Sequence, residues 1–552
     1  MDTAQSVLRL DASWVDYTLV AIYFLFVLSI GWAAKRRVSS SIDFFLSGRG
    51  LPAWVTGLAF ISANLGAVEI IGHSANGVQY GFQTMHYFWI GAVPAMVFLG
   101  IVMMPFYYGS KVRSVPEFMR RRFGSGAHLV NALSFAIAQL LIAGVNLLLL
   151  AKVVNSLLGW PLWVTLIVAA VIVVSYITLG GLSAAIYNEV LQFFVIVAAL
   201  LPLTIIGLHR VGGWSGLKES LPAGHFSTWP GQAISGFDSP VWSAVGIVFG
   251  LGFVLSFGYW TTNFVEVQRS MAAESMSAAR RTPIIGAFPK MLIPFLVVIP
   301  GMVAATIVTP IMDGSGEPND AILYLMRDLL PNGLLGVGIA GLLAAFMAGM
   351  AANISAFNTV MSYDLWQTYV IKDKPDEYYL RFGRIATVVA TVIAIFTALI
   401  ASNYGNVMDY LQTLFGFFNA PLFATFLLGM FWKRMTPHAG WVGLVLGTAS
   451  AIVYWYFAEV AEVSGALFDL EGQGTAFIAA SIAFVVDIVA SVVVTLFTQP
   501  KPDAELVGFV YSVTPHEQLV DPAEATRPWY ARTVPLGMVC LALVIALNIA
   551  FF

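Results

Sequence analysis

The sequence predicts an all-α membrane protein with about 14 transmembrane helices, and three observations support this fold class. Of the 552 residues, 59% are hydrophobic and only 10% are charged, whereas soluble domains average about 25% charged residues. Long apolar segments recur along the chain, and the positive charges fall into alternate loops between them. So much apolar surface needs a lipid bilayer around it. We therefore expect a bilayer partner and no nucleic-acid partner.

The apolar segments set the number of predicted helices. A helix needs about 20 apolar residues to cross a bilayer, and fourteen segments meet this requirement: roughly 14–34, 52–73, 82–108, 128–157, 161–179, 183–208, 241–266, 283–309, 332–368, 381–402, 406–431, 438–458, 474–498 and 533–551. The first segment lacks the pattern of a cleaved signal, so we expect it to remain as a helix. The single cysteine, Cys540, gives no disulfide framework and no cysteine metal site.

Lysine and arginine predict the orientation, because cytoplasmic loops carry an excess of both. The loops of one face carry 21 of the 27 cationic residues: Lys35, Arg36, Arg37, Arg49, Lys111, Arg113, Arg120, Arg121, Arg122, Arg269, Arg280, Arg281, Lys372, Lys374, Arg381, Arg384, Lys433, Arg434, Lys501, Arg527 and Arg532. The other face carries Arg9, Arg210, Lys218 and Arg327, while Lys152 and Lys290 lie within predicted helices. This alternation predicts a multi-pass protein of the cell membrane with both termini outside.

Two of the predicted helices are interrupted at matching positions. The segment 51–80 contains Gly66 within a run long enough to cross the membrane, and the segment 241–266 contains Gly250 and Gly252. Glycine is common in membrane helices, so either interruption alone is weak evidence. Five segments separate the two starts, however, so the two helices enter the membrane in opposite senses. Paired interruptions of this kind are typical of secondary transporters built from inverted repeats.

Glu69 and Lys290 are charged residues within apolar segments. Burying a carboxylate costs several kcal/mol unless it is paired or protonated, and Lys290 is the natural counterpart, although sequence spacing does not show that the two meet. Glu69 has the alternative of a structural hydrogen bond to a neighbouring helix. Lys290 has the alternative of extending its ammonium group to the inner surface.

Other polar residues allow two interpretations each. Glu189 opens the sixth segment either as a solvated carboxylate favoured by the helix dipole or as a residue on the exit path of a cation. His73 and His86 flank the outer end of the first interrupted helix and are more typical of packing than of ligand binding. Tyr259 after the second interruption would close a gate or simply pack. Asp487, in the thirteenth segment, has no functional interpretation.

Five motifs resemble the solute:sodium symporter family, in its sodium/sugar branch. They are SVPEF (114–118) followed by RRRFG, GGLSAAIYNEVLQ (180–192), FGYWTTNFVEVQR (257–269), KMLIPFLVVIPG (290–301) and LLGMFWKRMTPHAGWVG (427–443). The resemblance covers nearly the whole chain. It implies a five-plus-five inverted-repeat core with discontinuous first and sixth core helices. Residues 1–50 would then form a leading helix and inner loop, 51–209 the first repeat, 210–432 the second repeat, and 433–552 three trailing helices.

The resemblance also implies a solute site, with eight positions: Asn64, Glu69, Phe88, Gly91, Ser256, Tyr259, Lys290 and Gln412. Four of these keep the residue of the sugar branch: Asn64, Tyr259, Lys290 and Gln412. At the other four, Phe88 and Gly91 stand where that branch has a carboxylate and a hydroxyl, Ser256 replaces an amide, and Glu69 replaces a glutamine. A pocket changed in this way should take another sugar, a polyol or an amino-bearing solute.

The implied sodium site departs further from the family pattern. The family binds its ion through carbonyls of the first interrupted helix and through one carbonyl and two hydroxyls of the ninth segment. These positions fall on Ser62, Leu65, Ala345, Ala348 and Gly349. The last three residues have no hydroxyl, although Ser355 lies further along the same segment. The site is then weakened or rebuilt, or coupling has moved to a proton on Glu69 or Glu189, or coupling has been lost.

Together these observations predict a secondary active transporter that works by alternating access. We expect symport of a small polar solute, such as a sugar or polyol, with a coupling cation that is Na⁺ in the family. A proton-coupled symporter and an uncoupled uniporter are the alternatives. A membrane enzyme would need a grouped nucleophile, base and oxyanion donors, and a sensor would bring a signalling domain; the sequence shows neither. No organic cofactor is expected.

Overall fold

Helices form the regular structure of the described residues. The computed structural model describes residues 8–35, 47–402, 406–465 and 467–552. Arg36 and Arg37, two of the predicted inner-face cations, lie outside the described residues. The longer helices are α1 (Trp14–Lys35), α3 (Ala53–Asn64), α4 (Ala67–Tyr80), α8 (Ser125–Leu158), α9 (Leu162–Arg210), α15 (Met276–Ile307), α18 (Leu334–Thr359), α19 (Asp376–Ala401), α20 (Val407–Phe431), α21 (Pro437–Trp455), α22 (Gly474–Phe497) and α26 (Thr533–Ala550).

The remaining helical segments are shorter. The third predicted segment combines two π-helical pieces with α5 (Val93–Phe98) and α6 (Met104–Gly109). The seventh runs from α12 (Pro240–Val245) through π-helical residues 246–256 into α13 (Phe257–Thr262). Connecting helices are α7 (Val115–Phe123), α10 (Gly213–Ser220), α11 (Gln232–Ser235), α14 (Phe264–Met271), α16 (Thr309–Met312), α17 (Ala321–Leu329), α23 (Asp503–Leu506), α24 (His516–Leu519) and α25 (Pro522–Ala525).

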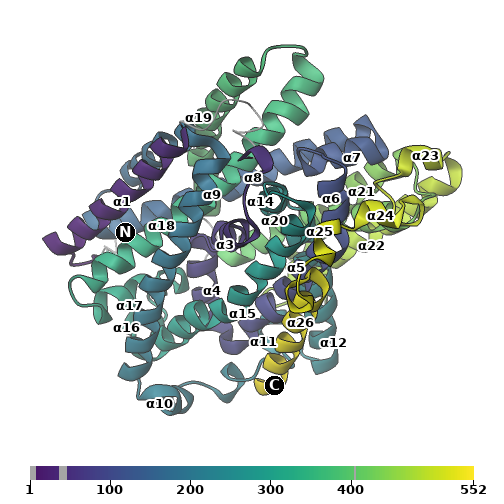
Figure 1. Ribbon diagram of the computed structural model, residues 1–552. Coiled ribbons are helices and arrows are strands. Elements are labelled where there is room, and N and C mark those ends of the chain that lie inside the picture. Colours follow the sequence, from purple (N-terminus) through teal and green to yellow (C-terminus); the bar gives the residue numbers. More distant parts are fainter. Residues whose placement is uncertain (1–7, 36–46, 403–405, 466) are drawn as a thin grey trace.

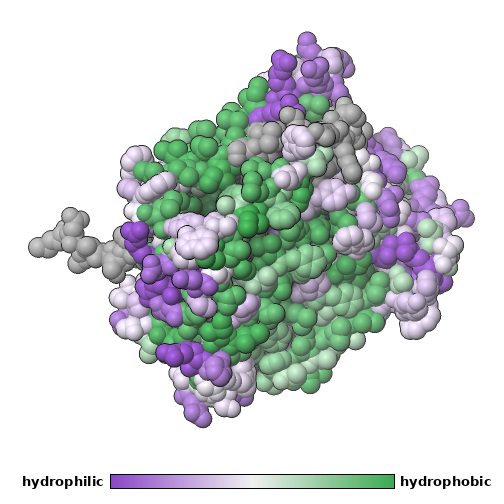
Figure 2. All heavy atoms as spheres, turned by 60° about the vertical axis from the view of Figure 1, so that its left-hand side comes forward, coloured by the Kyte–Doolittle hydropathy of each residue, from purple (hydrophilic) through white to green (hydrophobic). Residues whose placement is uncertain are grey.

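The described residues support a membrane protein with many crossings. Eleven helices are long and apolar enough to span a bilayer, and α3 with α4 makes a twelfth if this pair, bent by 54°, counts as one span. The predicted segments 14–34 and 161–179 coincide with shorter apolar helices, Trp14–Ile30 and Leu162–Ile172. Figure 2 shows hydrophobic residues over the middle of one face and hydrophilic residues gathered toward its opposite edges. The number of fourteen crossings remains a prediction.

One predicted boundary is wrong. We expected a loop between the fifth and sixth segments, at about residues 180–182, but α9 continues as one helix through both segments. A glycine inside a helix costs about 1 kcal/mol relative to alanine, and this cost does not by itself end a helix. The glycine pair at 180–181 is therefore too weak a signal for a loop.

The interrupted helices lie at the centre of the molecule. Figure 1 shows α3, α4, α14 and α15 in the middle, with α1 at one side and α21–α24 at the other. Helix α15 packs against both α3 and α4, and α18 packs against α9, α8 and α3. Helices α20, α21 and α22 pack on one another, and α26 lies against α15 and α5. The central helices are therefore enclosed by protein, which suits irregular backbone at membrane depth.

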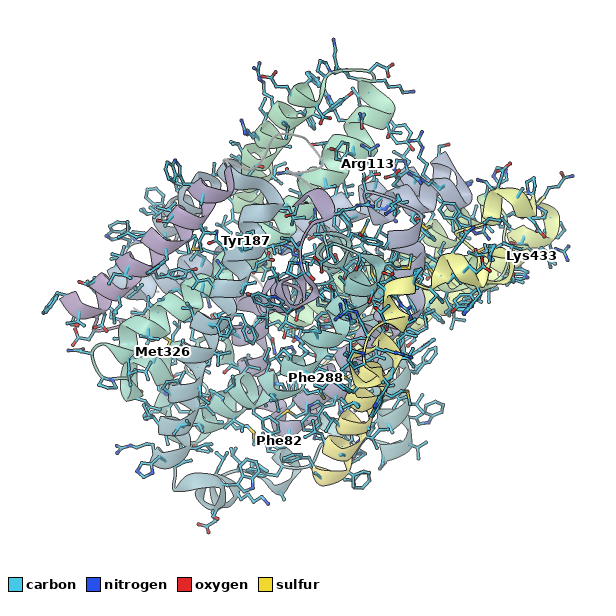
Figure 3. The ribbon with its side chains drawn as sticks, viewed as in Figure 1. Phe82, Arg113, Tyr187, Phe288, Met326 and Lys433 are labelled. Atoms are coloured by element: carbon cyan, nitrogen blue, oxygen red, sulfur yellow. The ribbon has the colours of Figure 1, made fainter. Side chains whose placement is uncertain are left out.

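The distribution of labelled residues agrees with two distinct ends. In Figure 3, Arg113 and Lys433, both predicted on the inner face, lie toward the upper right of the view. Phe82 and Met326, whose segments are predicted at the outer face, lie toward the lower left. The assignment of these two ends to the inside and outside of a cell remains a prediction.

Candidate functional site

A cavity lies where the two interrupted helices meet. The first interruption, between α3 and α4, falls at Leu65 and Gly66, as predicted. The second falls at Asn263, between α13 and α14, where ψ is 117°. The predicted position near Gly250–Tyr259 is wrong, because residues 246–256 continue as a π-helix and Tyr259 still lies in α13. The cavity volume is about 90 Å³, below the range of about 300–1,000 Å³ for ligand sites, so the lining side chains leave only a narrow space in this conformation.

Most of the predicted solute positions line this cavity: Asn64, Glu69, Phe88, Ser256, Tyr259, Lys290 and Gln412. Gly91 does not line it, but lies so close behind Ser256 that a methyl group at residue 91 would overlap the Ser256 hydroxyl. Gln412 is buried on α20, with its amide nitrogen 3.8 Å from the sulfur of Met408. The structure thus gathers residues from α3, α4, α13, α15 and α20 that are far apart in the sequence.

Lys290 stands at the centre of the cavity wall. Its ammonium group is buried and donates to Glu69 Oε2 at 3.0 Å and to Asn64 Oδ1. The same group lies 4.7 Å from the ring centroid of Phe88 and 5.1 Å from that of Trp260. Aromatic faces attract cations most strongly where water is excluded. The alternative in which Lys290 extends to the inner surface is therefore wrong, and Glu69 and Lys290 meet.

Glu69 also faces a histidine from its own helix. His73 Nε2 lies 3.4 Å from Glu69 Oε2, one turn further along α4, and the His73 ring packs on Phe88 with centroids 4.7 Å apart. His86 differs, because its Nε2 lies 2.6 Å from the carbonyl oxygen of Thr228 and it does not line the cavity. His86 is thus a packing residue, while His73 belongs to the cavity wall.

A hydrogen-bonded chain connects Lys290 with Tyr259 and a second carboxylate. Asn64 accepts from Lys290 through Oδ1 and donates through Nδ2 to the Tyr259 hydroxyl at 3.1 Å. Tyr259 in turn donates to Glu266 Oε1 at 2.7 Å, and its ring packs on Phe415 with centroids 4.6 Å apart. Sequence reasoning missed Glu266, although a carboxylate in the apolar motif FGYWTTNFVEVQR is a visible signal. The remaining oxygen of Glu266, Oε2, is buried without a hydrogen-bond partner among the described residues.

Glu189 has a different environment from the one we expected. It is fully buried and pairs with Arg269, whose Nη2 lies 2.5 Å from Oε1 and whose Nε lies 3.3 Å from Oε2. The interpretation of a solvated carboxylate at a helix start is therefore wrong. Arg269 belongs to α14, directly after the second interruption, so this buried pair joins α9 to the interrupted helix.

The predicted ion position lies where α18 passes the first interruption. A methyl group built on Gly66 would lie 3.4 Å from Gly349 Cα and 3.6 Å from the carbonyl oxygen of Ala345. The Ser62 hydroxyl is buried and has no hydrogen-bond partner among the described residues. Leu65, Ala345 and Ala348 are buried as well. Gly349 and Ala345 thus lie next to the interruption, where the three predicted residues of α18 can offer only backbone oxygens.

Asp487 is a buried residue outside this site. It accepts from the Thr425 hydroxyl at 2.8 Å and from the Ser491 hydroxyl at 3.3 Å. The contact with Thr425 joins α22 to α20, whereas the contact with Ser491 lies within α22. They give Asp487 a structural environment and no connection to the cavity.

Comparison with known proteins adds the family. Residues 44–447 match the family model described as Sodium:solute symporter family. The sodium/glucose cotransporter of Vibrio parahaemolyticus is 28% identical over 82% of this chain and 86% of its own length. Human sodium/glucose cotransporter 4 is 30% identical over 78% of this chain and 68% of its own length. Sodium/myo-inositol cotransporter 2 of Oryctolagus cuniculus is 28% identical over 78% and 68%.

Solved structures share the fold. A Na⁺-coupled sialic acid symporter superposes with a TM-score of 0.74 at 21% identity, covering 88% of this chain and 98% of that one. The nucleobase-cation-symport-1 family transporter Mhp1 superposes with a TM-score of 0.52 at 13% identity, covering 84% and 96%. These similarities support the inverted-repeat transporter architecture at the level of the fold.

Proposed function

Because the chain belongs to the sodium:solute symporter family, whose members carry a solute together with sodium, we propose that its solute is a neutral molecule rich in hydroxyl groups, such as a sugar or a polyol. The observation that carries this proposal is the Lys290–Glu69 pair in the wall of the cavity between the two interrupted helices. Its ammonium and carboxylate groups offer donors and acceptors side by side, as adjacent hydroxyls require.

Charge balance supports a neutral solute. The Glu69 carboxylate is already opposed by Lys290 at 3.0 Å, so an amino-bearing solute would have to compete with a resident cation. An anionic solute would face the same difficulty with Glu69. A hydroxyl group adds hydrogen bonds to the pair without adding a buried charge, whose desolvation costs several kcal/mol. The sugars and inositol in the names of the relatives fit this requirement.

The oxygen atoms around the predicted ion position support sodium coupling, whereas Glu69 and Glu189 give little support to proton coupling. Glu69 and Glu189, the two candidates for a coupling proton, are each already paired with a cation. The first interruption instead gathers backbone oxygens and the unpartnered Ser62 hydroxyl, and oxygen atoms are the ligands that hard cations prefer. Na⁺ bound there would stabilise the arrangement of α3, α4 and α18, and solute binding would then drive closure around Tyr259.

Uptake into proteoliposomes tests the proposal. A panel of labelled hexoses, inositols, amino sugars and sialic acid is presented under an inward Na⁺ gradient, under a pH gradient, and under neither. We expect neutral hydroxylated solutes to accumulate under the Na⁺ gradient alone. Accumulation driven by the pH gradient would establish proton coupling instead, and equilibration without accumulation under either gradient would establish a uniporter.

A further inference from the structure

A buried amide oxygen next to the first interruption has no partner. Asn146 lies on α8 and is 2% exposed. Its Nδ2 donates to the carbonyl oxygen of Ile142 at 3.2 Å, one turn earlier on the helix. Since a carbonyl oxygen accepts only from a donor, this bond fixes the orientation of the amide and leaves Oδ1 facing away from its own helix. Oδ1 then has no hydrogen-bond partner among the described residues.

The free oxygen of Asn146 is directed at the predicted ion position. A methyl group built on Gly349 would lie 2.8 Å from Oδ1, and one built on Gly66 would lie 3.6 Å from it. The carbonyl oxygen of Ala345 borders the same space, at 3.6 Å from the methyl position of Gly66. The two glycines thus allow the amide oxygen, α18 and the interrupted backbone to approach one another closely.

The interruption adds a further oxygen to this space. In an uninterrupted helix the amide of Gly66 would donate to the carbonyl of Ser62, but it donates instead to the carbonyl of Asn64 at 2.7 Å. The carbonyl of Ser62 therefore loses its helical donor, and the hydroxyl of the same residue is unpartnered as well. Two side-chain oxygens buried without donors, those of Ser62 and Asn146, are costly unless a cation or water satisfies them.

We propose that Asn146 Oδ1 is a ligand of the coupling cation and takes the place of the hydroxyl groups that α18 lacks at Ala345, Ala348 and Gly349. The other ligands are the Ser62 hydroxyl, the freed carbonyl of the first interruption and the carbonyl of Ala345. All are uncharged oxygens, a set that suits a monovalent hard cation such as Na⁺ better than a divalent one, which prefers carboxylates. The inference rests on the proposed sodium coupling and identifies Asn146 as the residue that completes the cation site.

Binding of ²²Na⁺ to the purified transporter tests the assignment without depending on transport. We expect Asn146→Ala to raise the half-saturating Na⁺ concentration by about tenfold or more, the loss of one ligand to a cation. Asn146→Asp keeps the oxygen and adds a negative charge, so it should lower the same concentration several-fold or more. Asn131→Ala is the matched control, because Asn131 is a buried asparagine on the same helix and should leave Na⁺ binding unchanged.

A second variant separates a ligand role from a merely structural one. Ala348→Ser introduced into Asn146→Ala returns a hydroxyl to α18 and should recover part of the lost Na⁺ affinity. Unchanged Na⁺ affinity in both Asn146→Ala and Asn146→Asp, with ²²Na⁺ binding intact in the wild type, would overturn this inference and leave the proposed symport standing. Absence of ²²Na⁺ binding in the wild type would overturn both.

Discussion

The ammonium group of Lys290 has two acceptors, and both come from the first interrupted helix: Glu69 at 3.0 Å, and Asn64. Removing one member of a buried ion pair leaves an uncompensated charge, which costs about 3–5 kcal/mol. Replacing both members by neutral groups removes that penalty. Comparison of the single with the double substitution therefore separates the contribution of the Lys290–Glu69 pair to stability from its contribution to solute binding.

Lys290→Met is expected to abolish solute accumulation and to destabilise the protein by about 3–5 kcal/mol, because Glu69 remains charged in the cavity wall. Lys290→Met combined with Glu69→Gln should recover much of the stability but none of the transport. Thermal unfolding in detergent and uptake into proteoliposomes measure the two effects. Lys152→Met is the control, because the Lys152 side chain is 25% exposed and partly exposed pairs contribute little. Full transport by the double variant would exclude the pair from solute recognition.

Tyr259→Phe should reduce the maximal rate of uptake by up to roughly tenfold, because it removes the hydrogen bond from Tyr259 to Glu266, and a hydrogen bond of this kind is worth about 0.5–1.5 kcal/mol. The ring contact with Phe415 remains, so the affinity for solute should change less than the rate. Initial-rate measurements over a range of solute concentrations separate the two. Tyr454→Phe, which removes a hydroxyl on peripheral α21, serves as the control. An unchanged maximal rate in Tyr259→Phe would exclude the hydroxyl from closure.

Charged residues in apolar runs are visible in a sequence, and for this reason the sequence alone identifies Glu69 and Lys290. Their pairing is not predictable in the same way, because it depends on how α4 and α15 cross. The same holds for Arg269, which the charge pattern places among the inner-face cations and which is buried against Glu189. The sequence does not identify Asn146 as a ligand, because the position of its free oxygen beside Gly66 and Gly349 depends on how the helices pack.

At the scale of elements, the contact between α4 and α15 depends on glycine. A methyl group at Gly77 would overlap the backbone carbonyl of Val298, and one at Gly301 would overlap that of Ser74. Backbone atoms cannot move aside as a flexible side chain can. Small residues at such crossings let membrane helices approach closely. The position of Glu69 opposite Lys290 therefore depends on glycines along these two helices.

Gly77→Ala is expected to destabilise the protein by about 1–3 kcal/mol, as overpacking does in cores. Gly72→Ala is the matched control on the same helix, because its methyl group would meet Met408 and Val407 at an ordinary 3.5 Å. Melting temperatures of the two purified variants make the comparison, with Gly77→Ala well below the wild type and Gly72→Ala close to it. Equal melting temperatures would show that α4 and α15 can move apart around the added methyl group without loss of stability.

Element boundaries can be predicted where a strong local signal exists. Gly66 and its polar neighbours locate the first interruption correctly. The second is misplaced, because Gly250 and Gly252 are accommodated in a π-helix, a form with no reliable sequence signature, while the real interruption is at Asn263. The side chain of Asn263 accepts from the amide of Val265 at 3.0 Å and so starts α14.

At the scale of the molecule, the loop between α22 and α26 is attached to the core through α15. Glu524 accepts from the Ser277 hydroxyl at 2.6 Å and from the amide of Thr533, and Asp521 accepts from the amide of Ser277 at 2.7 Å. Burial raises the pKa of Glu524, but these hydrogen bonds outweigh that effect, so its pKa lies below the usual 4.5. A carboxyl whose pKa is lowered on folding adds stability above its unfolded pKa and loses it as the pH falls through the folded value.

The loop is therefore expected to stay attached at neutral pH and to detach as the pH falls below about 4.5. A fluorophore on Glu517→Cys, in exposed α24, reports the attachment by its anisotropy. The anisotropy should fall on acidification in the wild-type background and should already be low at pH 7 with Glu524→Gln. Glu505→Gln, at a position 57% exposed, should not alter it at pH 7. High anisotropy in Glu524→Gln at pH 7 would contradict the assignment.

The architecture as a whole is the part most accessible from sequence. Span length and the placement of Lys and Arg reflect the bilayer itself, which acts alike on every helix, so they predict the helices and their alternation without any knowledge of contacts. Family motifs then indicate the inverted repeats, and the similarity to solved symporters supports that fold. Contacts between side chains depend instead on how the helices cross, and no local pattern in the sequence encodes those crossings.

The planar amide of Asn64 makes two hydrogen bonds, since Oδ1 accepts from Lys290 and Nδ2 donates to the Tyr259 hydroxyl. A planar group cannot turn one end without displacing the other. A solute that draws Lys290 toward itself would therefore weaken or reorient the hydrogen bond between Asn64 and Tyr259. Without a solute, that hydrogen bond stays in place. Solute occupancy and release of Tyr259 would therefore be coupled through this single side chain, and such coupling would oppose slippage, the passage of ions without solute.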